Sequence, residues 1–338
     1  MLTAVGLALL ALLVILGGCE LFTNAIEWFG RKLRLSEGVC GSVLAAVGTA
    51  LPETIVPIVA ILFGNAHDES RLHIGIGAIL GAPFMLTTLA FLVTGLSAII
   101  FHKAGRRGLR LQVNERIMRH DLEYFLVVYV VAIGASFIPA KLVRDLIAAA
   151  LLIAYAYYVW VHFKHECPLD ESCELAPLRC TPWAGTKPRL RFVVLQLAIA
   201  LAAIFAGAHI FVDNLSVVAA GLGVSPLVLA IIITPIATEL PEKFNSVLWV
   251  RQGKDTLALG NITGAMVFQS CIPVAVGIWF TPWELNTTAV ACAAAALVSA
   301  AVVTVYLKTR KHLSPYILFC GMPLYVAWLL VAFGSHGG

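Results

Sequence analysis

The feature that most constrains this chain is a series of apolar runs, each about 20 residues or longer, separated by short polar segments. A helix needs ~20 residues to cross the ~30 Å hydrocarbon core of a bilayer. Hydrophobic residues make up 60% of the chain and charged residues only 12%, which leaves too little polar surface for a soluble domain. The runs are also longer than the ~10-residue alternating strands of a membrane barrel. We therefore predict an all-α membrane protein.

The apolar runs predict ten transmembrane helices. The first run starts without the basic residues of a signal peptide, so we expect it to be retained as a helix. Pro83 is expected to interrupt the long third span. The predicted spans are 2–29, 39–63, 72–101, 122–138, 142–163, 191–217, 225–250, 256–280, 286–307 and 314–333.

The distribution of lysine and arginine predicts the orientation. Of the 23 basic residues, 19 lie in alternate connections between the predicted spans. By the positive-inside rule these connections are cytoplasmic, so both termini are expected outside the cytoplasm. The net charge of +4 follows from these connections and indicates no nucleic-acid partner. We expect a monomer embedded in the lipid bilayer, in a prokaryotic plasma membrane.

The chain contains an internal repeat. Residues 18–53 align with residues 207–242 without a gap, and four of the nine identities fall within one five-residue motif. This motif is Thr49-Ala-Leu-Pro-Glu53 in the first copy and Thr238-Glu-Leu-Pro-Glu242 in the second. A second similarity follows each motif, with Gly77 and Gly81 in the first copy and Gly260 and Gly264 in the second.

The repeat predicts two halves of five spans each. Residues 1–163 form the first half, 164–190 a cytoplasmic connecting loop and 191–338 the second half, with the most similar parts at about 39–101 and 225–280. An odd number of spans forces the second copy to cross the membrane in the opposite direction. Inverted repeats of this kind are typical of transporters, whose substrate site lies near the midplane on discontinuous helices.

The two repeated glutamates are the strongest candidates for function. Glu53 and Glu242 lie about midway along spans 2 and 7, where an ionised carboxylate is costly unless it is paired, hydrated or bound to a metal. Each follows a proline, which removes a helical hydrogen bond and frees a carbonyl. One interpretation is a protonated glutamate bonded to a neighbouring helix. The other is a site for a hard cation such as calcium, which prefers carboxylate, hydroxyl and carbonyl oxygens.

With these motifs the chain resembles the cation/calcium exchanger superfamily, whose members include sodium/calcium exchangers. The resemblance rests on Gly48-Thr49-Ala50-Leu51-Pro52-Glu53, on Thr238-Glu239-Leu240-Pro241-Glu242, on Gly260-Asn261 with Gly264, and on the segment from Val212-Asp213-Asn214 to Ser225. It implies ten spans with both termini outside. It also implies that the two glutamates bind calcium and that the two motif threonines contribute oxygens.

The chain departs from the family pattern at several positions. Ala50 and Glu239 replace the serine after each threonine, Ala82 and Ala265 replace the serine after the later glycine, and Leu86 and Gln269 replace an Asn or Asp. Several sodium ligands are therefore missing from the first repeat. The residues assigned to the cation site are Glu53, Glu242, Thr49, Thr238, Glu239 and Gln269.

Glu239 permits two interpretations. It can act as a third carboxylate that binds a proton or calcium, or it can pair with Lys243 four residues later. In a combined hypothesis, Lys243 occupies Glu239 as a tethered cation when the site is empty. Asp213, by contrast, is expected to make a hydrogen bond in the core rather than to bind an ion.

These observations predict a secondary cation antiporter that works by alternating access, exchanging calcium or a similar divalent cation for sodium or protons. The resemblance implies that spans 1 and 6 slide as a gate. Few hydroxyl groups accompany the glutamates, which favours protons slightly. No cofactor is expected beyond the transported ions, and the sequence contains no nucleotide-binding loop or nucleophile motif of an enzyme. The alternative is an ion-binding sensor or scaffold that does not transport.

Overall fold

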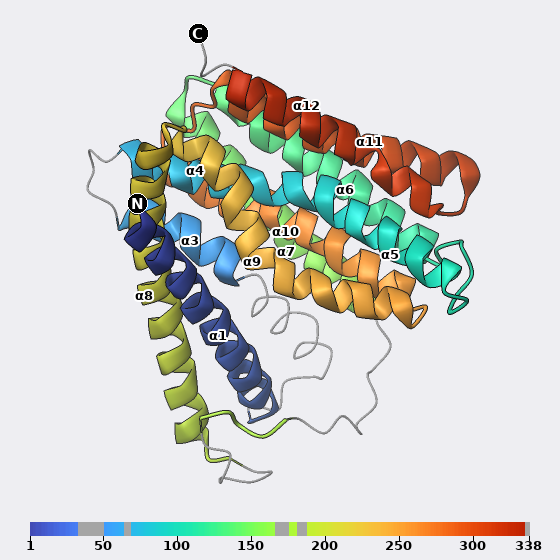
Figure 1. The fold of residues 1–338 in the computed structure, drawn as a ribbon, viewed down its shortest axis with the longest axis horizontal. Coiled ribbons are helices and arrows are strands. Elements are labelled where there is room, and N and C mark those ends of the chain that lie inside the picture. The colour runs from blue at the N-terminus through green and yellow to red at the C-terminus, as the bar shows by residue number, and fades with distance from the viewer. Residues whose placement is uncertain (33–50, 64–68, 166–175, 181–187, 335–338) are drawn as a thin grey trace.

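A computed structural model describes residues 1–32, 51–63, 69–165, 176–180 and 188–334. Within its helices, the side chains of residues 30–31, 51, 162–165 and 240–245 are not described. Apart from one isolated bridge between Leu111 and Leu313, the regular structure in these ranges is helical. The elements are α1 (Leu2–Lys32), α3 (Leu51–Leu62), α4 (Glu69–Met85), η2 (Leu86–Ala90), α5 (Phe91–Lys103), α6 (Glu115–Gly134), η3 (Ala135–Phe137), α7 (Lys141–His165), α8 (Leu190–Leu222), α9 (Pro226–Arg251), α10 (Asp255–Phe280), α11 (Thr287–Arg310), η5 (Pro315–Phe319) and α12 (Gly321–Gly334) (Figure 1).

Eight helical segments of the described chain are long and apolar enough to cross a membrane. Two shorter apolar segments, Pro52–Leu62 and Pro226–Glu239, lie where the second and seventh spans are predicted. Helix α9 itself continues to Arg251, but its second half carries Glu239 and further charged residues. The prediction of an all-helical membrane protein is confirmed.

The predicted interruption at Pro83 is a change of helical register rather than a break. Helix α4 continues through Pro83 and is followed by the π-helical turn η2 and then by α5. The wider turn leaves backbone carbonyls available, and the hydroxyl of Ser299 on α11 donates to the carbonyl oxygen of Thr87 at 2.6 Å. In the second half the expected discontinuity is wrong, because α9 runs without interruption through Pro235 and Pro241. A proline removes a single N–H donor, and the hydrogen bonds on either side can keep the helix intact.

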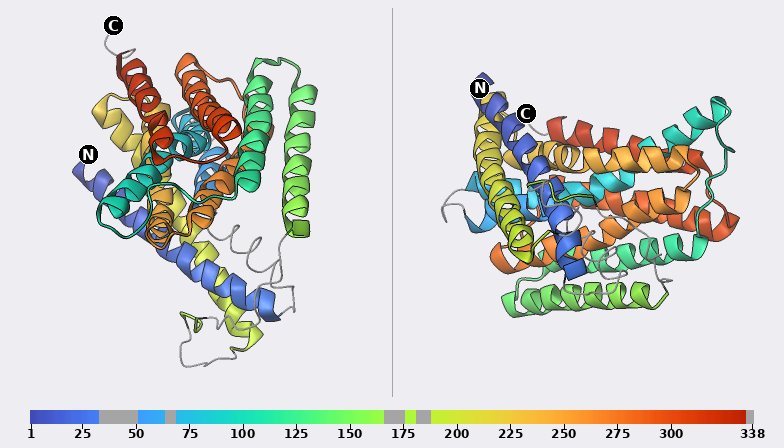
Figure 2. Two further views of the ribbon diagram at one scale, coloured as in Figure 1. Left: turned by 90° about the vertical axis from the view of Figure 1, so that its right-hand side faces the viewer. Right: turned by 90° about the horizontal axis from the view of Figure 1, so that it is seen from below.

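Helices α1 and α8 form an antiparallel pair that runs obliquely to the other helices and extends beyond them (Figures 1 and 2). A Cβ atom on Gly18 would lie 2.7 Å from Ile204 Cγ1, and one on Gly207 would lie 2.9 Å from Ile15 Cγ1. The two contacts are equivalent, because Ile15 and Ile204 each lie three residues before the corresponding glycine. The pair therefore packs around a local two-fold axis.

Helices α4 and α9 also pack with their backbones close together. A Cβ atom on Gly77 would lie 2.6 Å from the carbonyl oxygen of Leu227, and one on Gly81 would lie 2.5 Å from that of Ile231. The Ile231 carbonyl is the one that Pro235 leaves without its helical N–H donor. Small residues at such contacts let helices approach closely in a membrane.

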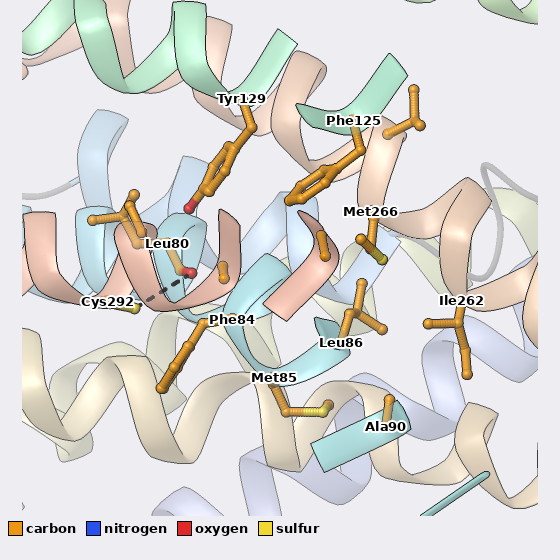
Figure 3. Close-up of a cluster of buried hydrophobic side chains, with 14 of the residues drawn as sticks. Leu80, Phe84, Met85, Leu86, Ala90, Phe125, Tyr129, Ile262, Met266 and Cys292 are labelled. Atoms are coloured by element: carbon orange, nitrogen blue, oxygen red, sulfur yellow. Dashed lines mark hydrogen bonds between the residues drawn. The ribbon is translucent and has the colours of Figure 1, made fainter. Parts of the chain in front are cut away.

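The main apolar core surrounds α4, η2 and α10. Leu80, Phe84, Leu86 and Met266 are buried in it and face Tyr129 of α6 and Cys292 of α11 (Figure 3). Aromatic stacking joins Phe84 to Tyr325 of α12 at a centroid distance of 5.1 Å. This core fixes α4 and α10 between the peripheral helices.

The connections α5–α6, α9–α10 and α11–α12 meet at one end of the bundle (Figure 1). Arg107 in the first connection forms a bidentate ion pair with Asp255, the first residue of α10, at 2.6 and 2.7 Å. Arg107 also donates to the carbonyl oxygen of Val250 at 2.8 Å. These three connections belong to the set predicted from their lysines and arginines to share one side of the membrane.

Candidate cation site

The candidate site is formed by α3, α4, α9 and α10. Each of these four helices packs against the other three. Two of them belong to the first half of the chain and two to the second. Glu53, Thr238, Glu239 and Gln269 are therefore carried by helices that meet in the interior.

Glu53 lies in the first turn of α3, directly after Pro52. The side chain of Glu53 is buried, with 4% of its surface exposed. Helix α3 also packs against α8 and α1, so it lies between the inner helices and the α1–α8 pair.

Helix α9 contributes three buried polar residues from two successive turns. Thr234 and Thr238 are 2% and 4% exposed, and Glu239 is 1% exposed. The Thr238 hydroxyl donates to the carbonyl oxygen of Thr234 at 3.0 Å. The predicted burial of Thr238 and Glu239 is thus observed. Thr234 was missed, although its place one turn before the motif threonine on a buried helix could have indicated it.

Glu239 and Gln269 are brought together by the packing of α9 against α10. The side-chain amide of Gln269 donates to Oε1 of Glu239 at 2.8 Å, and both side chains are buried. The two residues are 30 positions apart in the chain, so the contact was not foreseen. An amide donor lowers the cost of burying a carboxylate without neutralising it.

Two further oxygen atoms are available near this contact. Among the described residues, neither Oε1 of Gln269 nor Oγ1 of Thr234 has a hydrogen-bond partner, and both atoms are buried. A buried oxygen without a donor carries a desolvation cost of ~1–3 kcal/mol. Amide and hydroxyl oxygens of this kind are suitable ligands for a hard cation.

Some of the predicted ligands cannot be placed. Thr49 lies outside the described residues, and the side chains of Glu242 and Lys243 are likewise not described, although their backbone belongs to α9. In the described part of the chain, no three His, Cys, Asp or Glu side chains form a group that could hold a metal ion. The complete ligand set and the pairing of Glu239 with Lys243 therefore stay predictions.

Two residues of the first repeat that differ from the family pattern lie in the interior of the structure. Leu86 and Ala82 are buried, and Leu86 belongs to the apolar core that also contains Met266 (Figure 3). Thr87 and Thr88 follow, but their hydroxyls donate to backbone carbonyls of α4. The first repeat thus has a buried apolar side chain at the position that corresponds to Gln269 in the second repeat.

A buried carboxylate that the sequence reasoning missed is Asp121 on α6. Its Oδ1 accepts from the Tyr158 hydroxyl at 3.0 Å, and its Oδ2 accepts from the Thr263 hydroxyl at 2.7 Å. The predicted fourth span began at residue 122 and left Asp121 in the preceding loop, whereas α6 begins at Glu115. Asp121 thereby joins α7 to α10, the helix that carries Gln269.

Asp213 on α8 corrects another expectation. It forms an ion pair with Arg71 of α4 at 2.9 Å, and 55% of its side chain is exposed. The prediction of a core hydrogen bond for Asp213 is therefore wrong. The exposed face of α8 allows the carboxylate to reach Arg71, which is itself buried and also donates to the carbonyl oxygen of Phe63.

These features define a multi-pass, all-helical membrane protein with buried carboxylates at the junction of its two halves. The chain belongs to the sodium/calcium exchanger protein family, which matches residues 3–164 and 192–334. This is a family of transporters and not of enzymes, as the sequence predicted. The two matched segments correspond to the two halves of the repeat.

Relatives and solved structures agree with this assignment. The chain is 26% identical to the inner membrane protein YrbG of Escherichia coli K12 over 295 residues, covering 86% of this chain and 83% of YrbG. Its fold matches the crystal structure of an H+/Ca2+ exchanger, CAX, with a TM-score of 0.74 and 16% identity over 98% of this chain and 87% of CAX. It also matches the sodium-calcium exchanger NCX_Mj, soaked with Na+ and Sr2+, with a TM-score of 0.58 and 20% identity over 98% of each chain.

Proposed function

We propose that this protein is a secondary active antiporter that exchanges calcium, or a similar divalent cation, for sodium or protons by alternating access. Membership of the exchanger family supports exchange as the activity. The observation that carries the proposal is the burial of Glu53 and Glu239 on mutually packed helices from the two halves, with Gln269 bonded to Glu239. Carboxylates at this depth are costly to bury unless a cation or proton binds them.

The proposed topology is ten transmembrane helices in two inverted repeats, with both termini outside the cytoplasm. The antiparallel packing of α1 against α8 supports it, because these helices are equivalent in the alignment of the two halves. Equivalent helices that run in opposite directions are expected if the second half is inverted. The clustering of the α5–α6, α9–α10 and α11–α12 connections at one end supports the placement of the basic connections in the cytoplasm of a plasma membrane.

In the proposed cycle the cation binds between α3, α4, α9 and α10, and the α1–α8 pair moves across this site. Glu53 and Glu242 are the principal ligands, with oxygens from Thr49, Thr238, Glu239 and Gln269. Neutralisation of the carboxylates by calcium or by counter-ions lowers the cost of enclosing them and so permits the conformational change. Leu86 cannot supply a sodium ligand at the position that corresponds to Gln269, which favours protons as counter-ions.

The proposal is tested by calcium flux into proteoliposomes under an imposed sodium or proton gradient. We expect uptake by the wild-type protein and at least a tenfold loss in Glu53→Gln and Glu242→Gln. Glu284→Gln removes an exposed carboxylate in the α10–α11 connection and is expected to leave the flux unchanged. Absence of divalent-cation flux in the wild type, with calcium binding retained, would favour the sensor alternative, and undiminished flux in the glutamate variants would refute the site.

A further inference from the structure

A cluster of cations surrounds a cavity at the end of the bundle where the basic connections meet. The cavity has a volume of about 290 Å³ and lies between the beginning of α6 and the end of α11. Its lining residues are Glu115, Arg116 and Arg119 from α6 with Leu307, Lys308 and Lys311 from α11 and its C-terminal end. It is remote in sequence and position from the carboxylates of the candidate cation site.

The charges around this cavity do not cancel. Glu123 on α6 pairs with Lys308 at 2.8 Å and lies 3.8 Å from Arg119, so one carboxylate serves two cations. Arg116 and Lys311 have exposed side chains. Counting Glu115 and Glu123 against the four cations leaves two excess positive charges. A concave site with this balance attracts an anion.

Lys311 occupies a backbone position that ordinarily favours glycine. It ends α11 with φ of 54° and ψ of 26°, the left-handed conformation that costs a side-chain-bearing residue ~1–2 kcal/mol. The side chain at this position adds a cation to the cavity that glycine would not supply.

A separate apolar groove lies along α11, and it shares no lining residue with the cavity. The groove has a volume of about 570 Å³ and is lined mainly by Val298, Ala301, Val302, Val305 and Ile317, with Arg310 at its charged end. Lys308 follows Val305 by three residues and Ala301 by seven, so these side chains share one face of the helix. An apolar surface of this length, with cations at one end, has the pattern of a phospholipid: a charged headgroup followed by an acyl chain.

We propose that this cavity and groove form a binding site for an anionic phospholipid of the surrounding bilayer. The headgroup phosphate binds among Arg116, Arg119, Lys308 and Lys311, and one acyl chain lies along Val305, Val302 and Val298. Basic pockets between transmembrane helices on the cytoplasmic side are suited to anionic headgroups. Charge complementarity selects an anionic lipid over a zwitterionic one, and an apolar groove on the same helix favours a lipid over a soluble anion.

The test measures lipid binding by the full chain and is independent of transport. The detergent-solubilised protein is titrated with phosphatidylglycerol or phosphatidylcholine, and protection from thermal unfolding is followed by tryptophan fluorescence. We expect protection at lower concentrations of phosphatidylglycerol. The variant that combines Arg116→Gln with Lys311→Asn removes two cations, and asparagine tolerates the left-handed backbone at position 311. It should raise the half-protecting concentration, the phosphatidylglycerol concentration that gives half of the maximal protection, about 30-fold. This factor corresponds to ~1 kcal/mol per neutralised charge.

Two further variants test whether lipid protection depends on the charges that line the cavity. Arg106→Gln with Lys254→Gln removes two exposed cations outside the cavity and is expected to change the half-protecting concentration less than twofold. Glu115→Gln removes the acidic residue of the lining and should lower that concentration about fivefold. Equal protection by the two lipids, equal behaviour of the cavity and control variants, or equal protection by millimolar inorganic phosphate alone would each overturn the proposal.

Discussion

The contact between Gly81 and the backbone of α9 provides a quantitative test of the packing at the candidate site. In Gly81→Ala, the new methyl group would lie 2.5 Å from the carbonyl oxygen of Ile231 and 2.8 Å from its Cα atom. Ordinary contacts of a Cβ atom begin at 3.4 Å, so α4 and α9 must separate by roughly 0.9 Å. Because both neighbouring atoms belong to the backbone, a rotation of side chains cannot relieve the overlap.

The expected effect on stability combines two terms of opposite sign. Replacing glycine by alanine within a helix stabilises it by ~1 kcal/mol. Overpacking a tight interface costs ~1–3 kcal/mol. Gly17→Ala, in the interior of α1, supplies the first term alone, because a Cβ atom at Gly17 meets no atom within 4 Å. We therefore expect the free energy of unfolding of Gly81→Ala to fall below that of Gly17→Ala by ~1–3 kcal/mol.

The difference can be measured by unfolding both variants in mixed micelles with increasing sodium dodecyl sulfate, followed by tryptophan fluorescence. Gly75→Ala is a second comparison, because its Cβ atom would meet Cγ1 of the Ile61 side chain at 2.6 Å rather than backbone. We expect Gly75→Ala to be less destabilised than Gly81→Ala, because a side chain can shift more readily than the backbone of a packed helix. If Gly81→Ala unfolds at the same detergent fraction as Gly17→Ala, the close approach of α4 to α9 is refuted.

Three further predictions concern buried polar contacts. Gln269→Leu removes the amide donor to Glu239 and should destabilise the protein by ~1–3 kcal/mol. It should also alter the calcium concentration that gives half-maximal flux. A change in stability alone would argue against a role of Gln269 in the site. Arg107→Leu leaves Asp255 buried without its bidentate partner and should lower the free energy of chemical unfolding by ~3–5 kcal/mol. The double variant Arg107→Leu with Asp255→Leu should recover part of this loss. Asp121→Leu leaves two buried hydroxyls without their acceptor and should lower the free energy of unfolding by ~1–3 kcal/mol, so an unchanged unfolding curve would contradict the observed hydrogen bonds.

Much of the architecture could be predicted from the sequence, because the bilayer imposes a simple rule. A backbone in hydrocarbon must satisfy its own hydrogen bonds, so long apolar runs become helices. The predicted boundaries agree with the observed helices within a few residues at most ends, for example 256–280 for α10 (Asp255–Phe280). At α6 the predicted span began at residue 122, whereas the helix begins at Glu115. The prediction therefore left the buried Asp121 outside the helix.

The local effect of proline could not be predicted with the same success. Proline removes one hydrogen bond in every case, but the response of the helix depends on which neighbouring groups donate to its carbonyls or pack against them. Near Pro83 the helix widens into a π-helical turn whose carbonyl accepts from Ser299. Near Pro235 the helix stays regular and α4 approaches through Gly81. These neighbours are distant in the chain and are known only from the tertiary structure.

The sequence by itself determined the class of protein, the two halves and the glutamates on which the proposed function depends. These conclusions follow from hydropathy and from the duplicated motif, both of which are properties of the chain. Only the tertiary structure decided that Gln269 is the partner of Glu239, that Asp121 is buried, and that Arg116 and Lys311 border one cavity. Each of these facts depends on side chains from different helices meeting, and a linear pattern does not specify which faces of two helices pack together.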